Sequence, residues 1–400
     1  MAGQRRIRDI SDFDILRAKP VKAKGQIVIM MNVKSKDVEK KSRRYFIQSG
    51  MFIISSLLFG PRLLGKSLVT LEYQQPAFVL RPIGRSLQLA DYYIWCSSPI
   101  WGEDGKVHLF YSRWRKDKGM SGWIRGSEIA HAIADSPYDP FVHQSVILSP
   151  REGFWDSTTC HNPLIKKVGE TYYLFYMGNS NGKTDTKRIG VAKSKSLKGP
   201  WERPDAPCLL PGIEGAWDDH CTTNPAFIEG TDGKYWLFYK SWNTKEYLEA
   251  KGTVRGNRKY GLAKADRPEG PYYKQEENPV IDFSNHPANA QLEDAFVWKQ
   301  NDEYYMIARD MGFYNHEYGL LLASKDGLQW TEPKVSYLDM PAYLHEGSAP
   351  MHLKRFGRLE RPMLLLNPRS GEPKFLFGAS QGGGSETSTT VVFEIQSYTL

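Results

Sequence analysis

The sequence predicts an all-β fold, a five-bladed β-propeller with four-stranded blades, because one pattern of short strands and turns recurs along the chain. In its first three copies, a strand that contains a proline is followed by a turn and then by a Leu-Phe-Tyr strand. The prolines are Pro99, Pro163 and Pro225, which stand 64 and 62 residues apart. A repeat of short β segments separated by glycine turns is typical of propeller blades.

Each unit continues with a third strand and an outer segment, and two weaker units follow the first three. The expected third strands are residues 128–133, 189–192, 260–263, 318–323 and 389–393. In the two weaker units, the expected first strands are residues 295–298 and 362–366. Alternating apolar and polar residues, with many aromatic and β-branched side chains, favour strands throughout. A two-sheet sandwich is the alternative fold.

The N-terminal segment, residues 1–66, lies outside the repeat. Its Arg43 and Arg44 precede a short apolar run at residues 51–59, and this order is typical of an export signal. The paired arginines resemble the twin-arginine type, and the apolar run is too short for a comfortable membrane span. A buried N-terminal helix is the alternative. We therefore expect an exported protein, periplasmic or extracellular, without a stable membrane span once the signal is removed.

The charge distribution separates this leader from the rest of the chain. Residues 1–66 carry 15 Lys and Arg against 5 Asp and Glu, whereas residues 67–400 carry 38 against 40. The basic excess therefore belongs to the leader, and a nucleic-acid partner is not expected for the folded part. If translation starts at the methionines of positions 30–31, residues 1–29 lie upstream of the true start. We assign residues 67–400 to one propeller domain.

Polar and aromatic residues gather before and along the expected first strands, which a propeller brings to its axis. Amides and carboxylates there can bind sugar hydroxyls, and indoles can cover the apolar face of a sugar ring. The histidines are alternatively core residues, and the arginines are alternatively structural ion pairs or ligands of a sulfate or uronate group. The expected substrate-binding residues are His161, Asn162, His220, Asn224, Asp294, Arg309, Glu346, Arg361, Trp101 and Trp242.

The four cysteines show neither zinc-type nor redox-type spacing. They are Cys96, Cys160, Cys208 and Cys221. Small buried residues are the expected role, and a disulfide between neighbouring blades is the alternative. We expect no metal and no cofactor, with a divalent cation on the axis as the open alternative.

The five units resemble the five-bladed glycosidase superfamily, which includes glycoside hydrolase families 43, 32, 117 and 130. The resemblance spans residues 85–400. In family 43, three acidic residues come from the first strands of separate blades. The resemblance gives the general-acid role to Glu293, in the Leu-Glu-Asp-Ala-Phe segment. It leaves the other two roles unfilled, because Ser98 and Asn224 stand where the family places aspartates before proline.

Three aspartates are the nearest replacements for the missing general base. Asp156 and Asp218 each follow a Trp and stand seven residues before a blade proline. Such a repeated Trp-Asp can equally cap a turn between blades. Asp219 departs from the repeat, so we expect it to be the leading candidate for the base.

The sequence thus predicts an exo-acting glycoside hydrolase that releases a sugar from a plant or algal oligosaccharide, sulfated ones included. The family resemblance implies inversion of configuration. Two alternatives stay open: a glycan-binding propeller without catalysis, and a glycoside phosphorylase with Arg309 and Arg361 at a phosphate site.

Overall fold

The computed structural model describes residues 21–23, 26–28, 75–251, 255–286, 290–346, 357–381 and 385–400. The chain divides into two compact units, Met1–Thr70 and Leu71–Leu400. In the first unit, β1 (Val21–Ala23) pairs antiparallel with β2 (Gln26–Val28). The expected export signal, with its paired arginines and apolar run, lies outside the described residues.

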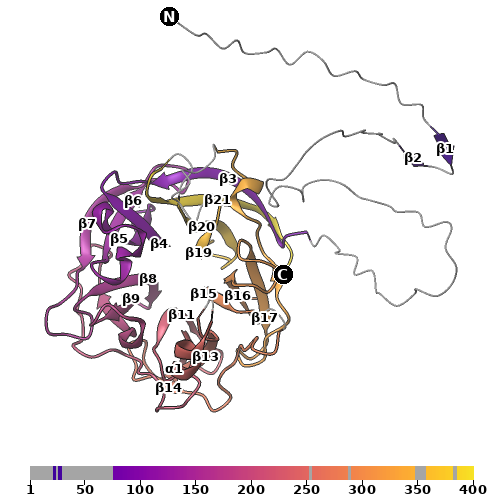
Figure 1. Cartoon of the computed structure of the whole chain (residues 1–400). Coiled ribbons are helices and arrows are strands. Elements are labelled where there is room, and N and C mark those ends of the chain that lie inside the picture. Colours follow the sequence, from indigo (N-terminus) through magenta and orange to yellow (C-terminus); the bar gives the residue numbers. More distant parts are fainter. Residues whose placement is uncertain are drawn as a thin grey trace, which may run out of the picture. The chain divides into compact units, whose positions relative to one another are not determined.

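The second unit is a five-bladed propeller of antiparallel sheets arranged around one axis (Figure 1), which confirms the predicted all-β architecture. Blade 1 contains β4 (Tyr92–Trp101), β5 (Val107–Arg115), β6 (Glu128–Ala134) and β7 (Val142–Leu148). Blade 2 contains β8 (Thr159–Val168), β9 (Thr171–Asn179) and β10 (Arg188–Ser194). Blade 3 contains β11 (Thr223–Glu229), β12 (Tyr235–Ser241), β13 (Lys259–Ala265) and β14 (Tyr273–Lys274). Blade 4 contains β15 (Leu292–Gln300), β16 (Glu303–Asp310), β17 (Gly319–Ser324) and β18 (Lys334–Val335). Blade 5 contains β19 (Glu360–Leu366), β20 (Pro373–Gln381), β21 (Ser388–Tyr398) and β3 (Phe78–Leu87).

Helical segments are few and short in the described part of the propeller. The α-helix is α1 (Thr244–Glu249), and the side chain of Asn243 caps it by accepting a hydrogen bond from the backbone N–H of Glu246. Short 3₁₀ turns lie at Lys116–Lys118, Met120–Ile124, Thr184–Thr186 and Met340–Ala342. None of the described helices has the length and apolar character needed to cross a membrane.

The ring of blades closes through strands from the two ends of the propeller unit. Strand β3, at the start of this unit, pairs antiparallel with β21 near the C-terminus and forms the outer edge of blade 5. Blade 2 departs from the four-stranded pattern, because its outer segment makes only the isolated bridges Ile189↔Leu209 and Lys193↔Glu202. The closure thus completes blade 5 with a strand that directly precedes blade 1 in the chain.

Aromatic side chains hold neighbouring blades together. Each of the five interfaces contains a ring pair at the 4.5–7 Å separation at which aromatic contacts are favourable, and burial of these rings adds apolar area to the core. The pairs are Phe110–Trp201 (5.6 Å), Phe175–Phe227 (4.7 Å), Trp236–Tyr304 (4.8 Å), Phe78–Trp298 (6.4 Å) and Phe141–Phe377 (5.9 Å).

All five inner strands contain a β-bulge near the axis. The register shifts fall at Trp95/Ser98, His161/Leu164, Thr223/Ala226, Glu293/Phe296 and Glu360/Met363. One residue in each bulge has a left-handed backbone: Cys96 (φ 56°), Asn162 (φ 56°), Asn224 (φ 53°), Asp294 (φ 64°) and Arg361 (φ 59°). A bulge re-aims side chains that a regular strand would direct at the two sheet faces. The bulges therefore direct one side chain from each blade toward the axis.

We predict that Phe175→Ala destabilises the protein by about 3–5 kcal/mol, because the mutation opens a cavity between blades 2 and 3. Phe175 is fully buried and stacks on Phe227. Chemical unfolding followed by tryptophan fluorescence measures the change. The control is Ile213→Ala at a side chain that is 84% exposed, where we expect a change within about 0.5 kcal/mol. Equal effects of the two substitutions would contradict the packing described here.

Candidate active site

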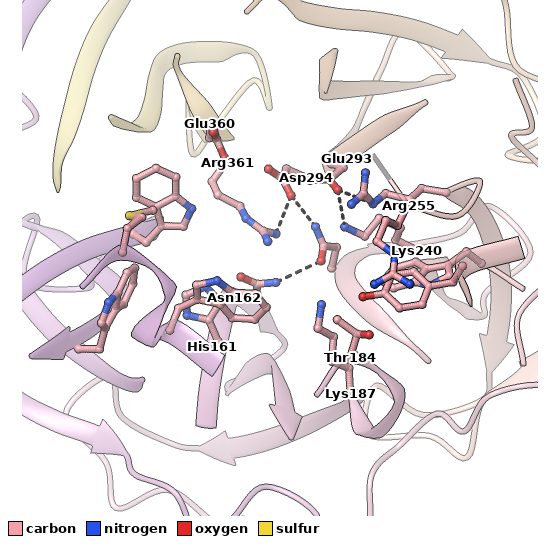
Figure 2. A pocket seen from close by; sticks show the side chains of 18 residues that line it. His161, Asn162, Thr184, Lys187, Lys240, Arg255, Glu293, Asp294, Glu360 and Arg361 are labelled. Atoms are coloured by element: carbon pink, nitrogen blue, oxygen red, sulfur yellow. Dashed lines mark hydrogen bonds and ion pairs between the residues drawn. The ribbon is translucent and has the colours of Figure 1, made fainter. Parts of the chain in front are cut away.

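A polar pocket of about 230 Å³ opens at the propeller axis (Figure 2). All five blades contribute to it, and tryptophans, cations and carboxylates make up most of its walls. It is lined by Trp95, Trp114, Met120, Trp123, His161, Asn162, Thr184, Lys187, Asn224, Lys240, Trp242, Tyr247, Arg255, Arg258, Glu293, Asp294, Glu360 and Arg361.

The floor of the pocket is a ring formed by the five left-handed bulge residues. Cys96 Sγ donates to Asn162 Oδ1 at 3.0 Å, and Asn162 Nδ2 donates to Asn224 Oδ1 at 3.1 Å. Asn224 Nδ2 donates to Asp294 Oδ1, and Arg361 Nη1 lies 2.8 Å from the same oxygen. A second cavity of about 10 Å³ is lined by all five ring residues, four of which also line the pocket. The ring thus separates the pocket from the remainder of the axis.

Glu293 stands on β15 among three cations. Its carboxylate oxygens lie 2.7 Å from Arg258 Nε, 3.2 Å from Lys240 Nζ and 3.8 Å from Arg309 Nη1. Burial opposes ionisation, but these cations outweigh it and hold the pKa of Glu293 well below its ordinary value. Glu293 therefore stays ionised at neutral pH.

Asp294 follows immediately in the chain and behaves in the opposite way. Burial raises the pKa of this carboxyl group; the positive charge of Arg361 opposes the rise, and the negative charge of Glu293 adds to it. The bulge places both carboxyl groups on the pocket wall, although they are sequence neighbours (Figure 2). One wall thus holds one carboxyl group that keeps its charge and one that is inclined to hold a proton.

Lys187 enters the pocket between two indoles. Its Nζ lies 4.8 Å from the ring centroid of Trp123 and 5.5 Å from that of Trp242. The residue is 7% exposed, and burial lowers its pKa to about 7. It follows the 3₁₀ turn Thr184–Thr186, which joins β9 to β10.

His161 is a neutral imidazole on the pocket wall. Burial, followed by the charges of Arg361 and Lys187, lowers its pKa well below the ordinary value. The ring stacks on Trp123 at 5.3 Å, and Nδ1 is 2.9 Å from Ser127 Oγ. A neutral imidazole that is stacked and hydrogen-bonded in this way is suited to contact a ligand. It is not suited to act as a general acid at neutral pH.

Most of the expected substrate-binding residues reach this pocket or its wall. Arg309 lies behind the wall, 2.9 Å from Glu360, and His220 packs against the far side of Trp242 with ring centroids 5.2 Å apart. Those that line the pocket are His161, Asn162, Asn224, Asp294, Arg361 and Trp242, together with the expected acid Glu293.

Two expected binding residues lie outside the set that lines this pocket. Trp101 ends β4, and its indole N–H donates to the carbonyl of Leu366 at 3.1 Å. Glu346 forms a two-pronged ion pair with Arg85, with N–O distances of 2.8 and 2.6 Å. Neither residue is among those that line the axial pocket.

The structure also places the three candidate bases outside the pocket, and the first two fix side chains of their own blades. Asp156 accepts from Tyr176 OH at 2.9 Å and is paired with Arg151 and Arg203. Asp218 accepts from Tyr239 OH at 2.9 Å and is paired with Lys274. The repeated Trp-Asp is therefore a structural device, in which each carboxylate anchors the tyrosine of its Leu-Phe-Tyr strand.

Asp219, the leading candidate for the base, fixes a loop instead. Its carboxylate accepts from the backbone N–H of Thr244 at 2.6 Å and from that of Gly215 at 2.8 Å. These bonds tie the start of α1 to the preceding loop, which explains why Asp219 has no equivalent in blade 2.

The structure corrects the alignment of blade 1 with the other blades. Counting from the proline makes Ser98 equivalent to Asn162 and Asn224, but the bulge residue of blade 1 is Cys96. The shift arises because Pro99 stands three residues after its bulge residue, whereas Pro163 and Pro225 follow theirs directly. The ring position of blade 1 is thus a buried thiol, and burial raises its pKa to about 12.

Several pocket residues were missed from the sequence, above all the cations Lys187, Lys240, Arg255 and Arg258. Lys240 carried a signal, because it follows Leu-Phe-Tyr where the first two units have Ser112 and Met177. The other three cations lie in connections outside the repeated strands, so the repeated sequence pattern gives no signal for them.

Within the described parts of the chain, no group of three or more His, Cys, Asp or Glu is placed to hold a metal ion. Arg361 instead provides the positive charge that Asp294 faces. All four cysteines are free thiols, so the alternative of a disulfide between blades is not realised.

Comparison with known protein families identifies one match. The model of glycosyl hydrolases family 43 matches residues 141–326, which include Asn162, Asn224, Glu293 and Asp294. No curated protein matches the chain.

Solved structures share the fold at low sequence identity. Zg3597, a family 117 glycoside hydrolase from the marine bacterium Zobellia galactanivorans, has a TM-score of 0.56 and 17% identity over 80% of this chain and 91% of its own. BT0996, in an RGII complex, has a TM-score of 0.61 and 17% identity over 79% and 91%. A GH43_1 enzyme from Xanthomonas citri, complexed with xylotriose, has a TM-score of 0.52 and 13% identity over 79% and 90%. The chain thus shares the fold of five-bladed glycoside hydrolases, and its central part matches the model of one of their families, which supports a glycoside hydrolase of this superfamily.

We predict that Arg361→Met costs about 3–5 kcal/mol of stability at pH 8, because it leaves the buried Asp294 carboxylate without its cation. The loss should shrink as the pH falls, since a protonated Asp294 no longer needs the guanidinium. Chemical unfolding at pH 8 and pH 5 measures both values. The double variant Asp294→Asn with Arg361→Met should recover part of the stability at pH 8. A cost independent of pH and of residue 294 would contradict this pairing.

Proposed function

We propose that this member of the propeller glycoside hydrolase superfamily is an exo-acting enzyme that releases the terminal sugar of an oligosaccharide. Two features support end-on binding. The ring of bulge residues closes the pocket at its floor. The pocket volume of about 230 Å³ is also below the about 300–1,000 Å³ of sites for larger ligands.

The walls suit a sugar ring. Trp95, Trp114, Trp123 and Trp242 offer flat apolar surfaces, and the amides of the ring offer both donors and acceptors. An indole covers the C–H face of a sugar while polar side chains bind its hydroxyls. Binding of this kind fixes the orientation of the terminal residue against the carboxyl wall.

The observation that carries the proposal is a pair of neighbouring carboxyl groups on the pocket wall, of which Glu293 meets Arg258 and Lys240 and Asp294 meets Arg361. Glycoside hydrolysis needs one carboxylic acid to protonate the leaving oxygen and one carboxylate to act on water or on the sugar. Groups whose pKa values are pushed apart by their surroundings fit these two roles. The pKa of Asp294 is raised and that of Glu293 is lowered. We therefore assign the general acid to Asp294 and the ionised carboxylate to Glu293.

This assignment differs from the family resemblance, which gives the general-acid role to Glu293 and not to Asp294. A carboxylate held by Arg258, Lys240 and Arg309 releases its proton too readily to serve as an acid near neutral pH. Because Glu293 stays ionised, its carboxylate is free to accept a proton from an attacking water, but the cations that lower its pKa also weaken it as a base. Inversion would need the two carboxyl groups on opposite faces of the sugar ring, and here both lie on one wall of the pocket. The inversion implied by the family resemblance therefore stays a prediction, which NMR of the first-formed anomer tests.

Substrate source and location form part of the proposal. Complexes of the neighbouring structures with xylotriose and with RGII make plant oligosaccharides the first to screen, followed by algal ones. The leader with its paired arginines supports export before the enzyme meets such substrates.

The glycan-binding alternative has one observation in its favour, because none of the three expected bases lines the pocket. It predicts oligosaccharide binding without turnover. The phosphorylase alternative loses its proposed phosphate ligands, since Arg309 and Arg361 are already paired with Glu360 and Asp294.

We predict that Asp294→Asn lowers turnover of natural oligosaccharides by several orders of magnitude but lowers turnover of activated aryl glycosides far less. An activated leaving group needs little protonation, so loss of the acid matters less for it. Glu293→Gln should lower turnover of both substrate classes to a similar extent, because the ionised carboxylate is needed for either class. Steady-state kcat/KM for the two classes provides the comparison.

The reverse pattern, with Glu293→Gln sparing aryl glycosides and Asp294→Asn not, would return the acid role to Glu293. Binding of oligosaccharide by both variants, measured by calorimetry, controls for collapse of the pocket. Binding by the wild type without hydrolysis of any screened substrate would favour the glycan-binding alternative.

A further inference from the structure

We propose that Lys187 and Arg255 bind an oxyanion carried by the terminal sugar, either a carboxylate or a sulfate ester. The inference rests on the proposed function in that it takes this pocket to hold a sugar. It names the chemical class of the substrate and a binding position that no repeat marks.

The pocket holds more positive than negative side chains. Its lining contains Lys187, Lys240, Arg255, Arg258 and Arg361 against Glu293, Asp294 and Glu360. The carboxylates are already paired: Glu293 with Lys240 and Arg258, Asp294 with Arg361, and Glu360 with Arg309 from behind the wall. Lys187 and Arg255 are the cations of the lining left over from these pairs. A neutral sugar would provide no anion to pair with either of these cations.

Of the two cations, Lys187 gives the stronger evidence for an oxyanion site. It is 7% exposed, and its ammonium forms neither a hydrogen bond nor an ion pair with any residue in the described part of the chain. The two flanking indoles, Trp123 and Trp242, offer only their faces. Burying an ammonium without an anion is costly, so a position of this kind fits a ligand that supplies the missing negative charge.

Arg255 adds a second cation at the solvent side of the pocket. It is exposed, and its guanidinium lies over the ring of Tyr247, 4.5 Å from the centroid. No described carboxylate pairs with it. A planar guanidinium binds carboxylate and sulfate oxygens through two parallel donors, whereas the Lys187 amine acts as a point charge. Both cations line the same pocket, so both attract an oxyanion that enters it from solvent.

The location indicates a substituent of the sugar and not a reactant at the scissile bond. Figure 2 shows Lys187, beside Thr184, extending into the pocket from the side opposite Glu360, Asp294 and Arg361. A sugar that presents its glycosidic oxygen to Asp294 would therefore direct its other side toward Lys187. Free phosphate acting as a nucleophile would be needed at the carboxyl wall instead.

The test compares matched sugars that differ only in charge. The probes are D-glucose, D-glucuronate and D-glucose 6-sulfate, and the corresponding galactose series, each titrated by NMR or calorimetry at pH 6 and constant ionic strength. We expect at least one acidic probe to bind about tenfold or more tightly than its neutral match. The carboxylate and sulfate arms identify which oxyanion the site takes.

Three variants locate the effect. Lys187→Met should remove about tenfold of the preference for the acidic probe and leave neutral-sugar binding within about twofold, whereas Lys187→Arg should keep most of it. Arg255→Met should remove a smaller part. Lys245→Met is the control, because Lys245 lies on α1 with its side chain 80% exposed and should behave like the wild type.

The pH profile separates binding by charge from a packing role. The charged groups that act on Lys187 are Cys221, Lys240, Glu293 and Arg258, and the flanking rings are Trp123 and Trp242. Two histidines, His161 and His220, also face its charge, and the pKa of each is lowered. Below its pKa of about 7 the amine is charged, and above it the amine is neutral. Affinity for the acidic probe should therefore fall between pH 6 and pH 8.5 in the wild type. Lys187→Arg should show little change, since a guanidinium does not titrate there.

Equal affinity for neutral and acidic probes, or an acidic preference that survives Lys187→Met, would overturn the inference and leave the hydrolase proposal standing. Failure of every probe to bind would overturn both the inference and the sugar-binding pocket. Inorganic phosphate that competes at Lys187 and accelerates cleavage would assign the site to a free reactant, which also overturns it.

Discussion

A bulge in each inner strand is the constraint on which the axial site depends. Five residues, one from each blade, adopt a left-handed backbone that side chains other than glycine rarely accept. Each such residue costs on the order of 1–3 kcal/mol, and the hydrogen bonds of the ring offset part of that cost. Because of the bulges, pairs of consecutive residues such as Glu293 and Asp294 reach the same pocket. A regular strand would direct them to opposite faces. The backbone geometry therefore determines which side chains can act together.

Once these side chains are gathered, their charges decide what each can do. Glu293 and Asp294 are neighbours with the same functional group, yet three cations act on one and burial dominates the other. The same competition acts on Lys187, because burial among indoles lowers the pKa of its amine. Desolvation raises the pKa of an acid and lowers that of a base, and nearby opposite charge reverses the effect. The pocket thus combines a carboxyl group with a raised pKa, a carboxyl group with a lowered pKa and an amine that lacks an anion, all within about 230 Å³.

The local repeat predicts the blades well because each strand and turn is specified by its own residues. The closing strand β3 was not assigned from the sequence, since its partner β21 lies some 300 residues away and no local pattern links them. In the site, Asn162, Asn224, Asp294 and Arg361 were predicted because they fall on first strands. Asp156 and Asp218 were misassigned because a structural and a catalytic carboxylate look alike in sequence. Lys187 could not be found, because the path of the loop that carries it depends on packing against blade 3.

The central claim is that neighbouring carboxyl groups at the axis hold different charges, with Asp294 protonated more readily than Glu293. The most direct measurement is a ¹³C NMR titration of the two carboxyl carbons in the unliganded protein, with Glu293→Gln and Asp294→Asn used to assign the signals. The account predicts that Glu293 titrates well below the ordinary glutamate value of 4.5 and Asp294 above the ordinary aspartate value of 3.8. An aspartate that titrates below the glutamate would contradict it.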